Sequence, residues 1–241
     1  MSYLTYMLPE QIKKAVDEQW PVVIPAGCIE LHGNHLPVGT DLIIVEEIIK
    51  KVEPHVRIVV IPSIAFGPTG YAVGDPKSGT VDVRVSVFKD YVKDILLAFY
   101  RMGFREFVVI LQHQGPDGPE GVSFKMAAAE IFNEFKELYG EAWFTKNYSN
   151  EKSNEVFLNL KVMGATVNEY PWPGSHGAWG ETEPMLALRP EYVAMDKLKP
   201  GDFPWNWCEG NEAIKSEKEH GDKLMNEIVK DWIEFFKLYL H

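Results

Sequence analysis

The chain has 241 residues, of which 46% are hydrophobic, and carries a net charge of −11 at pH 7. This acidic balance argues against a nucleic-acid-binding surface, because phosphate contacts need clustered lysine and arginine. The length and apolar content suit one large core, so we expect a single domain over 1–241. No apolar run reaches the ~18 residues of a membrane span, and the N-terminus lacks the pattern of a signal peptide. Only Cys28 and Cys208 are present, so we expect a cytoplasmic protein without a disulfide framework.

Short apolar runs alternate with amphipathic segments through the first half of the chain. The expected strands lie at 20–27, 56–67 and 105–115, and the expected helices lie at 8–19, 41–52 and 85–103. Each expected strand is a continuous apolar run, which is typical of a parallel sheet that helices cover on both faces. The pattern therefore predicts an α/β fold with a mostly parallel central sheet, in which ligands bind beyond the carboxyl ends of the strands.

The second half of the chain is less regular. Its expected elements are a helix at 121–140, a strand or short helix at 154–163, a helix at 183–191 and an amphipathic helix at 221–240. No linker rich in serine or glycine separates these elements from the first half, which supports the single-domain prediction.

Residues 27–41, GCIELHGNHLPVGTD, place acids and histidines directly after the first expected strand. Glu30 and His32 are two apart, so an extended chain points them to the same side. His113 ends the third expected strand and should reach the same edge of the sheet. Imidazole and carboxylate ligands suit Zn, Mn or Fe, and a carboxylate between two ions ~3.5–4 Å apart commonly activates water. The alternatives are a helix N-cap role for Asp41 and ordinary hydrogen-bonded positions for the histidines.

A second candidate segment, WPGSHGAWGETE, contains His176 among glycines and tryptophans. A histidine there suits a general acid or base, since its ordinary pKa is near ~6.5; the alternative is a loop histidine without a role. Glu181 either binds a metal or places negative charge at the start of the next helix.

Three stretches resemble the creatininase (creatinine amidohydrolase) family. They are VVIPAGCIELHGNHLPVGTD, the loop and strand IAFGPTGY…SGTVDV…GFREFVVILQH, and HGAWGETEPMLALRP. The match runs in order over roughly residues 20–190, and several separated motifs agree, which is more specific than any single motif.

The resemblance implies a three-layer α/β/α sandwich with two divalent metal ions per chain, Zn, Mn or Fe. It implies that Glu30, Asp41 and His113 hold one ion and that His32 and Asp41 hold the other, with Asp41 as the bridge. Water between the ions would attack an amide-type carbon, and His176 would carry the proton to the leaving nitrogen.

The loop after the third strand departs from the family pattern. Many members carry asparagines where this chain has Leu111 and Pro116, and creatininase has a glutamate ligand where this chain has Gly115. Creatinine itself is therefore a less favoured substrate than another small amide.

The second ion needs a further ligand to replace the missing glutamate. We expect Glu181, which falls at the family's E-T-S motif and would also belong to the catalytic set; the alternatives are Asp117 and Glu120. Glu183 stands where the family has serine, and it either favours a cationic or sugar-like substrate or caps the helix.

Substrate contacts are expected from Trp172, which matches a family tryptophan that packs on the substrate, and from Trp179 and His35. Family members commonly form homo-oligomers, often hexamers, so we expect a homo-oligomer that binds a small molecule.

The expected function is hydrolysis of a C–N bond in a small cyclic amide, lactam or formamide. The first alternative is an isomerase, lyase or lactonase that uses the same two ions on a small polar or sugar-like substrate. The second alternative is a binding subunit without turnover, which a retained acid/base histidine argues against.

Overall fold

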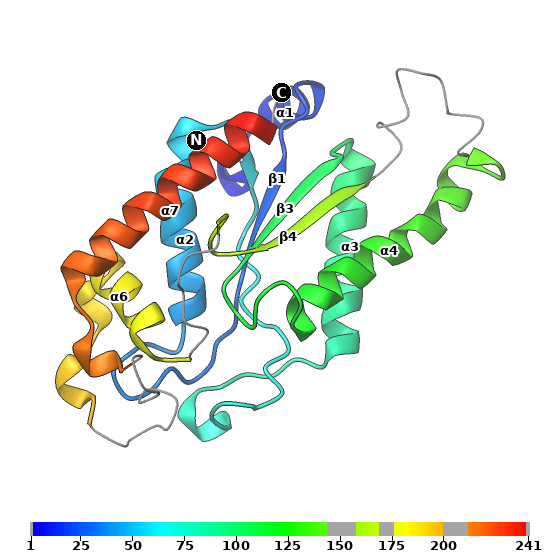
Figure 1. Ribbon diagram of the computed structural model, residues 1–241. Coiled ribbons are helices and arrows are strands. Elements are labelled where there is room, and N and C mark those ends of the chain that lie inside the picture. The colour runs from blue at the N-terminus through cyan, green and yellow to red at the C-terminus, as the bar shows by residue number, and fades with distance from the viewer. Residues whose placement is uncertain (1, 144–157, 169–175, 200–211, 240–241) are drawn as a thin grey trace.

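The computed structural model describes residues 2–143, 158–168, 176–199 and 212–239. A four-stranded sheet forms its centre, with strand order β2-β1-β3-β4 and parallel neighbours throughout (Figure 1). The strands are β1 (Val22–Ala26), β2 (Val59–Val60), β3 (Glu106–Leu111) and β4 (Asn159–Gly164). Ala26 pairs with Leu111, so β1 and β3 end side by side at one edge of the sheet.

Helices pack on both faces of this sheet (Figure 1). One face carries α1 (Pro9–Asp17), α3 (Val85–Met102) and α4 (Pro119–Tyr139), and the other carries α2 (Thr40–Val52), α6 (Trp179–Leu188) and α7 (Lys218–Tyr239). Alternate strand residues supply the two cores: Val22 and Ile24 pack with the first set of helices, and Val23 packs with the second. The expected three-layer α/β/α sandwich is therefore confirmed. None of the helices in the described ranges is long and apolar enough to cross a membrane.

The strand expected at 56–67 is mostly irregular, because only Val59–Val60 pairs regularly with β1. The chain still follows β1 beyond this pair, since Ile61 N donates to Val23 O at 3.1 Å and Ile64 N donates to Pro25 O at 2.9 Å. These two donors are three residues apart, whereas their acceptors on β1 are two residues apart, so one extra residue interrupts the regular pairing, as in a β-bulge.

Two elements of the second half differ from their predicted form. The segment at 154–163, left open between strand and helix, contains a strand from Asn159, while 154–157 lie outside the described residues. The helix expected at 183–191 begins at Trp179 and ends at Leu188. A 3-10 turn follows at Pro190–Tyr192, because a proline cannot extend the α-helical hydrogen-bond pattern.

Candidate metal centre

The chain that leaves β1 folds back onto the first turn of α2. Gly27 permits this contact, because a Cβ at that position would lie 2.8 Å from the Cβ of Asp41. The N–H of Glu30 donates to the Val38 carbonyl at 2.9 Å and closes the intervening loop. Asp41 therefore lies against the segment that carries Glu30 and His32.

Asp41 is not the N-cap of α2, so that interpretation of the sequence is wrong. The helix begins at Thr40, and Gly39 is its N-cap. The Asp41 carboxylate turns away from the helix end, where its Oδ2 accepts from Cys28 N at 3.4 Å. This orientation leaves both carboxylate oxygens facing histidines.

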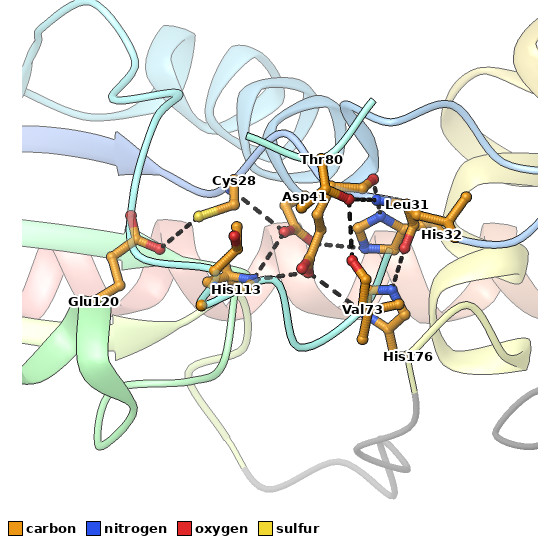
Figure 2. A network of polar contacts seen from close by, with 12 residues as sticks. Cys28, Leu31, His32, Asp41, Val73, Thr80, His113, Glu120 and His176 are labelled. Atoms are coloured by element: carbon orange, nitrogen blue, oxygen red, sulfur yellow. Dashed lines mark hydrogen bonds and ion pairs between the residues drawn. The ribbon is translucent and has the colours of Figure 1, made fainter. Parts of the chain in front are cut away.

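One donor group joins the ends of β1 and β3. His113 Nδ1 lies 2.9 Å from Glu30 Oε1 and 3.4 Å from Asp41 Oδ2, and all three side chains are buried (Figure 2). The adjacent ends of β1 and β3 explain this contact between Glu30 and His113. Their donor atoms and that of Asp41 lie within 4.8 Å of one another, which suits one cation.

A second donor group shares Asp41 with the first. His32 Nε2 lies 3.1 Å from Asp41 Oδ1 and 3.7 Å from Glu181 Oε1. Glu181 comes from the first turn of α6, and its Oε2 accepts from Gly177 N at 2.6 Å. Asp41 thus presents a different oxygen to each group, and the donor sets fit a pair of adjacent cations.

A backbone hydrogen bond orients the His32 ring so that Nε2 faces Asp41 and Glu181. Its Nδ1 lies 3.0 Å from the Glu30 carbonyl oxygen and donates to it, which assigns the acceptor role to Nε2 in the neutral ring. A metal-binding histidine usually has its other N–H fixed in this way.

In the metal-free protein these groups form an ion-paired cluster. Burial alone would lower the pKa of His32, but the charges of Asp41 and Glu181 raise it well above its ordinary value. Burial would likewise lower the pKa of His113, and its contacts with the Asp41 and Glu30 carboxylates raise it instead. The pKa of Asp41 is lowered, because the two histidines outweigh the effect of burial.

We expect the metal-free protein to lose stability as the pH rises from 6.5 to 8.5. The folded-state pKa values of His32 and His113 lie above the ordinary 6.5. Below pH 6.5 both histidines are protonated in the folded and unfolded states, and their ion pairs stabilise the fold in full. As the pH rises from 6.5 towards the raised folded-state pKa values, the unfolding free energy falls by at most ~1.4 kcal/mol per pH unit for each histidine. Urea unfolding in the presence of a chelator measures this slope. An unfolding free energy that increases over this range would contradict the ion-paired cluster.

His176 lies beside both donor groups. Its Nε2 donates to the Leu31 carbonyl, and its Nδ1 lies 3.5 Å from Glu30 Oε1. Its ring lies next to that of His32, with centroids 4.1 Å apart and planes tilted by 30°. The Leu31 carbonyl therefore fixes the tautomer of a neutral His176, with Nδ1 as the proton-accepting atom.

A neighbouring loop holds this segment in place. Thr80 Oγ1 accepts from Leu31 N at 3.0 Å and donates to Val73 O at 3.0 Å (Figure 2). Val81 N also donates to Ile29 O at 2.9 Å. The loop thereby fixes the backbone of residue 31, which lies between Glu30 and His32 and orients His176.

A cavity of about 470 Å³ opens over the donor groups. Its lining includes four of the predicted site residues: Glu30, His113, His176 and Glu181. Gln112, Gln114 and Thr166 contribute neutral polar groups to the same wall. The cavity has the size of a small-molecule site.

The structure does not bring His35 or Trp179 to this cavity. His35 is 1% exposed, and its Nε2 bonds to Thr182 Oγ1 at 2.9 Å; burial lowers its pKa to about 4. The Trp179 ring lies 5.8 Å from the ring of His220, and neither residue lines the cavity. Trp172 lies outside the described residues.

The two alternative ligands from the sequence analysis, Asp117 and Glu120, lie elsewhere. Asp117 is on the surface, where it pairs with Lys125 at 2.7 Å, so it is not a ligand of either group. Glu120 is buried next to Cys28 and His113, away from the second donor group.

Glu183 faces neither the cavity nor the start of its own helix. Its Oε1 accepts from Glu217 N at 3.3 Å, and its Oε2 lies 2.6 Å from His220 Nδ1, at the first turn of α7. Both sequence-based interpretations of Glu183 are therefore wrong, because it binds the beginning of a different helix.

Several residues of the site gave no signal in the sequence. Thr80 and the Leu31 carbonyl act through hydrogen bonds to backbone atoms, which no motif spacing reveals. Gln112 and Gln114 flank His113, and Gln114 has a left-handed backbone (φ +55°), which is uncommon outside glycine and often marks functional sites.

The family of this chain follows from a match over nearly its whole length. The model of the creatininase family, described as creatinine amidohydrolase, matches residues 5–236. The chain belongs to the creatininase family. The resemblance in the three motifs is thereby confirmed.

Two curated relatives of this creatininase-family chain are hydrolases by name. The 3-dehydro-scyllo-inosose hydrolase of Thermotoga maritima is 26% identical over 207 residues, which cover 84% of this chain and 62% of that protein. The creatinine amidohydrolase of Pseudomonas putida is 25% identical over 194 residues, which cover 76% of this chain and 71% of that protein. The chain thus spans less than two thirds of the length of the first relative.

Solved creatininase structures share the fold. A manganese form aligns with a TM-score of 0.76 at 17% identity and covers 99% of this chain and 98% of its own. A variant in complex with creatine aligns with a TM-score of 0.75 at 16% identity, over 99% and 98% of the two chains.

Proposed function

We propose that this protein is a metal-dependent amidohydrolase that cleaves a C–N bond of a small cyclic amide, lactam or formamide. The observation that carries the proposal is the position of Asp41. Its Oδ1 lies 3.1 Å from His32 Nε2, and its Oδ2 lies 3.4 Å from His113 Nδ1. A carboxylate that offers one oxygen to each of two donor groups suits a pair of adjacent divalent ions. The family and its hydrolase relatives support the reaction class.

Glu30, Asp41 and His113 would hold one ion, and His32, Asp41 and Glu181 would hold the other. When bound, the ions polarise the substrate carbonyl and supply an activated water as the nucleophile. Nitrogen and carboxylate donors suit Zn, Mn or Fe, and solved creatininases in zinc and manganese forms support the first two.

His176 would move the proton in this reaction. Its Nε2–H is committed to the Leu31 carbonyl, so Nδ1 is the atom that accepts a proton at the cavity. The same nitrogen then donates that proton to the leaving amine, as a general acid after acting as a base. Leu31 thus orients the base, in the role that a third group has in catalytic triads.

Elemental analysis tests the metal content directly. The purified protein should contain about two divalent ions per chain, lose its hydrolase activity on chelation and regain it when metal is returned. Fewer than one ion per chain, with activity unchanged by a chelator, would contradict the proposal.

The charge of the cavity predicts a neutral or cationic substrate. None of the described residues that line it is lysine or arginine, whereas Glu30 and Glu181 are both acidic. Two divalent ions would bring four positive charges, and the carboxylates of Glu30, Asp41 and Glu181 would offset three of them. A carboxylate on the substrate would therefore lack a counter-charge in the described part of the wall.

For a ring that the enzyme accepts, we expect a carboxylated analogue to have a kcat/KM at least ~10-fold lower, a difference of ~1.4 kcal/mol. Dihydrouracil and dihydroorotate form one suitable pair, since they share a ring and differ in one carboxylate. Equal kcat/KM values for both members of an accepted pair would contradict the predicted preference.

A second candidate function rests on one relative. The 3-dehydro-scyllo-inosose hydrolase, 26% identical to this chain, is named for a carbocyclic polyol ketone and not for an amide. The same ion pair could then act on a sugar-like substrate as a lactonase, lyase or isomerase. Measurement of ammonia and amine release separates the two, because turnover of such a substrate without either product would favour the second function.

A further inference from the structure

His113 differs from His32 in how its second ring nitrogen is satisfied. His32 donates its Nδ1–H to the Glu30 carbonyl and turns Nε2 to the donor group. His113 turns Nδ1 to Glu30 and Asp41, so its Nε2 points away from the metal centre. That Nε2 is buried and has no hydrogen-bond partner among the described residues.

A buried acid lies on this rear side of His113. Glu120 is fully buried in the first turn of α4, and its Oε1 likewise has no hydrogen-bond partner in the described part of the chain. A Glu120 oxygen, a ring nitrogen of His113 and the Cys28 sulfur lie within 4.8 Å of one another. Figure 2 shows Glu120 and Cys28 on one side of His113 and Asp41 on the other.

The surroundings hold the Glu120 carboxylate in this place. The Cys28 thiol, whose pKa burial raises to about 12, donates to Glu120 Oε2 at 3.6 Å. Gly67 packs directly on the pair, because a Cβ there would lie 3.0 Å from the Cys28 sulfur and 3.0 Å from Glu120 Cδ. A larger residue at position 67 would therefore not fit unless Cys28 or Glu120 moved.

We propose that Glu120 is a positioning residue of the metal centre, which accepts the Nε2–H of His113 and holds its Nδ1 towards the ions. Histidine ligands in metal sites characteristically donate their second N–H to a carboxylate or a carbonyl. The two unpartnered atoms, a donor and an acceptor, provide that pair here. This inference rests on the proposed metal-dependent function, because it requires His113 to be a ligand.

A positioning role and a purely structural role of Glu120 predict different effects of Glu120→Leu on stability and on metal affinity. A buried carboxyl group with one oxygen unpartnered costs folding free energy, and an apolar residue of similar size removes that cost. We therefore expect the metal-free Glu120→Leu protein to be at least as stable as the wild type. Its metal affinity should nevertheless fall ~10–100-fold, because His113 loses its support.

The experiment measures metal affinity by competition with a chromophoric chelator, for Zn²⁺ and Mn²⁺ separately. Thermal unfolding of each metal-free variant reports stability independently of activity. Glu120→Gln should retain affinity within ~10-fold of the wild type, because its amide oxygen still accepts from His113. Glu134→Leu is the matched control on α4, since that side chain pairs with Lys93 and should leave the affinity unchanged.

The outcomes separate this inference from the proposed function. A wild type that binds neither metal overturns the proposed function itself. Two ions bound equally well by the wild type and by both Glu120 variants overturn only the role of Glu120. The wild type could also bind a third ion, and both Glu120→Leu and Cys28→Ala could abolish that binding. This result would identify Glu120 as a ligand and would also overturn the positioning role. If Glu120→Leu does not fold, Glu120→Met replaces it: its metal affinity should fall ~10–100-fold below that of the wild type, and an unchanged affinity would overturn the positioning role.

Discussion

Replacement of Asp41 by alanine is expected to remove both metal ions together and to reduce hydrolysis more than ~10³-fold. Asp41 contributes one oxygen beside His32 and the other beside His113, so neither donor group keeps its carboxylate bridge. The reaction would lose the stabilisation that the ions provide, which amounts to several kcal/mol. Elemental analysis and kcat/KM of the same preparation measure the two effects.

Asp117→Ala is the control for this variant. Its carboxylate is 90% exposed and pairs only with Lys125 among the contacts described, so metal content and activity should stay at wild-type values. An Asp41→Ala protein that keeps one ion at full occupancy would show that Asp41 serves a single ion and does not bridge two.

Replacement of His176 by alanine is expected to keep both ions and to lower kcat ~10²–10⁴-fold, the usual contribution of a positioned acid or base. The proposed metal ligands lie on other residues: His176 Nδ1 lies 3.5 Å from Glu30 Oε1, and its ring is tilted by 30° against that of His32. Steady-state kinetics with metal analysis separates turnover from metal binding. One limb of the pH profile of kcat/KM should also disappear.

His55→Ala is the matched histidine control, because His55 is exposed at the end of α2 and far in sequence from the cavity-lining residues. It should change neither kcat nor metal content. Loss of an ion from His176→Ala would instead make His176 a ligand, together with Glu30 and His32, with which its donor atoms also cluster.

The sheet and its helices were predictable because buried strands and amphipathic helices have characteristic patterns of apolar residues. All of β1 and residues 107–111 of β3 are apolar, since helices cover both sides of each strand. The length of β2 was not predictable in the same way. Regular pairing stops at one extra residue between Ile61 and Ile64, and an apolar run does not report where such a residue falls.

Part of the site followed from the same topology. Parallel strands end at one edge, which is why Glu30 and His113 meet although they are 83 residues apart in the chain. Asp41 places one oxygen beside His32 and the other beside His113, and Glu183 points to the start of α7. Both orientations depend on side-chain rotamers, which neither periodicity nor spacing determines. The ligand and catalytic roles themselves stay predictions, as do the cytoplasmic location and the hexamer implied by resemblance. Sedimentation equilibrium would measure the assembly.

The end of the chain is connected to the metal centre through α6. Two residues apart on a helix point to nearly opposite sides, so Glu181 reaches His32 while Glu183 binds the start of α7. Gly221 lets the two backbones touch, since a Cβ there would lie 2.1 Å from the Glu183 carbonyl oxygen. A fusion partner, a truncation or proteolysis that detaches the last helix would therefore shift Glu181 on α6, and we expect the protein to lose its proposed metal ions before its central sheet unfolds.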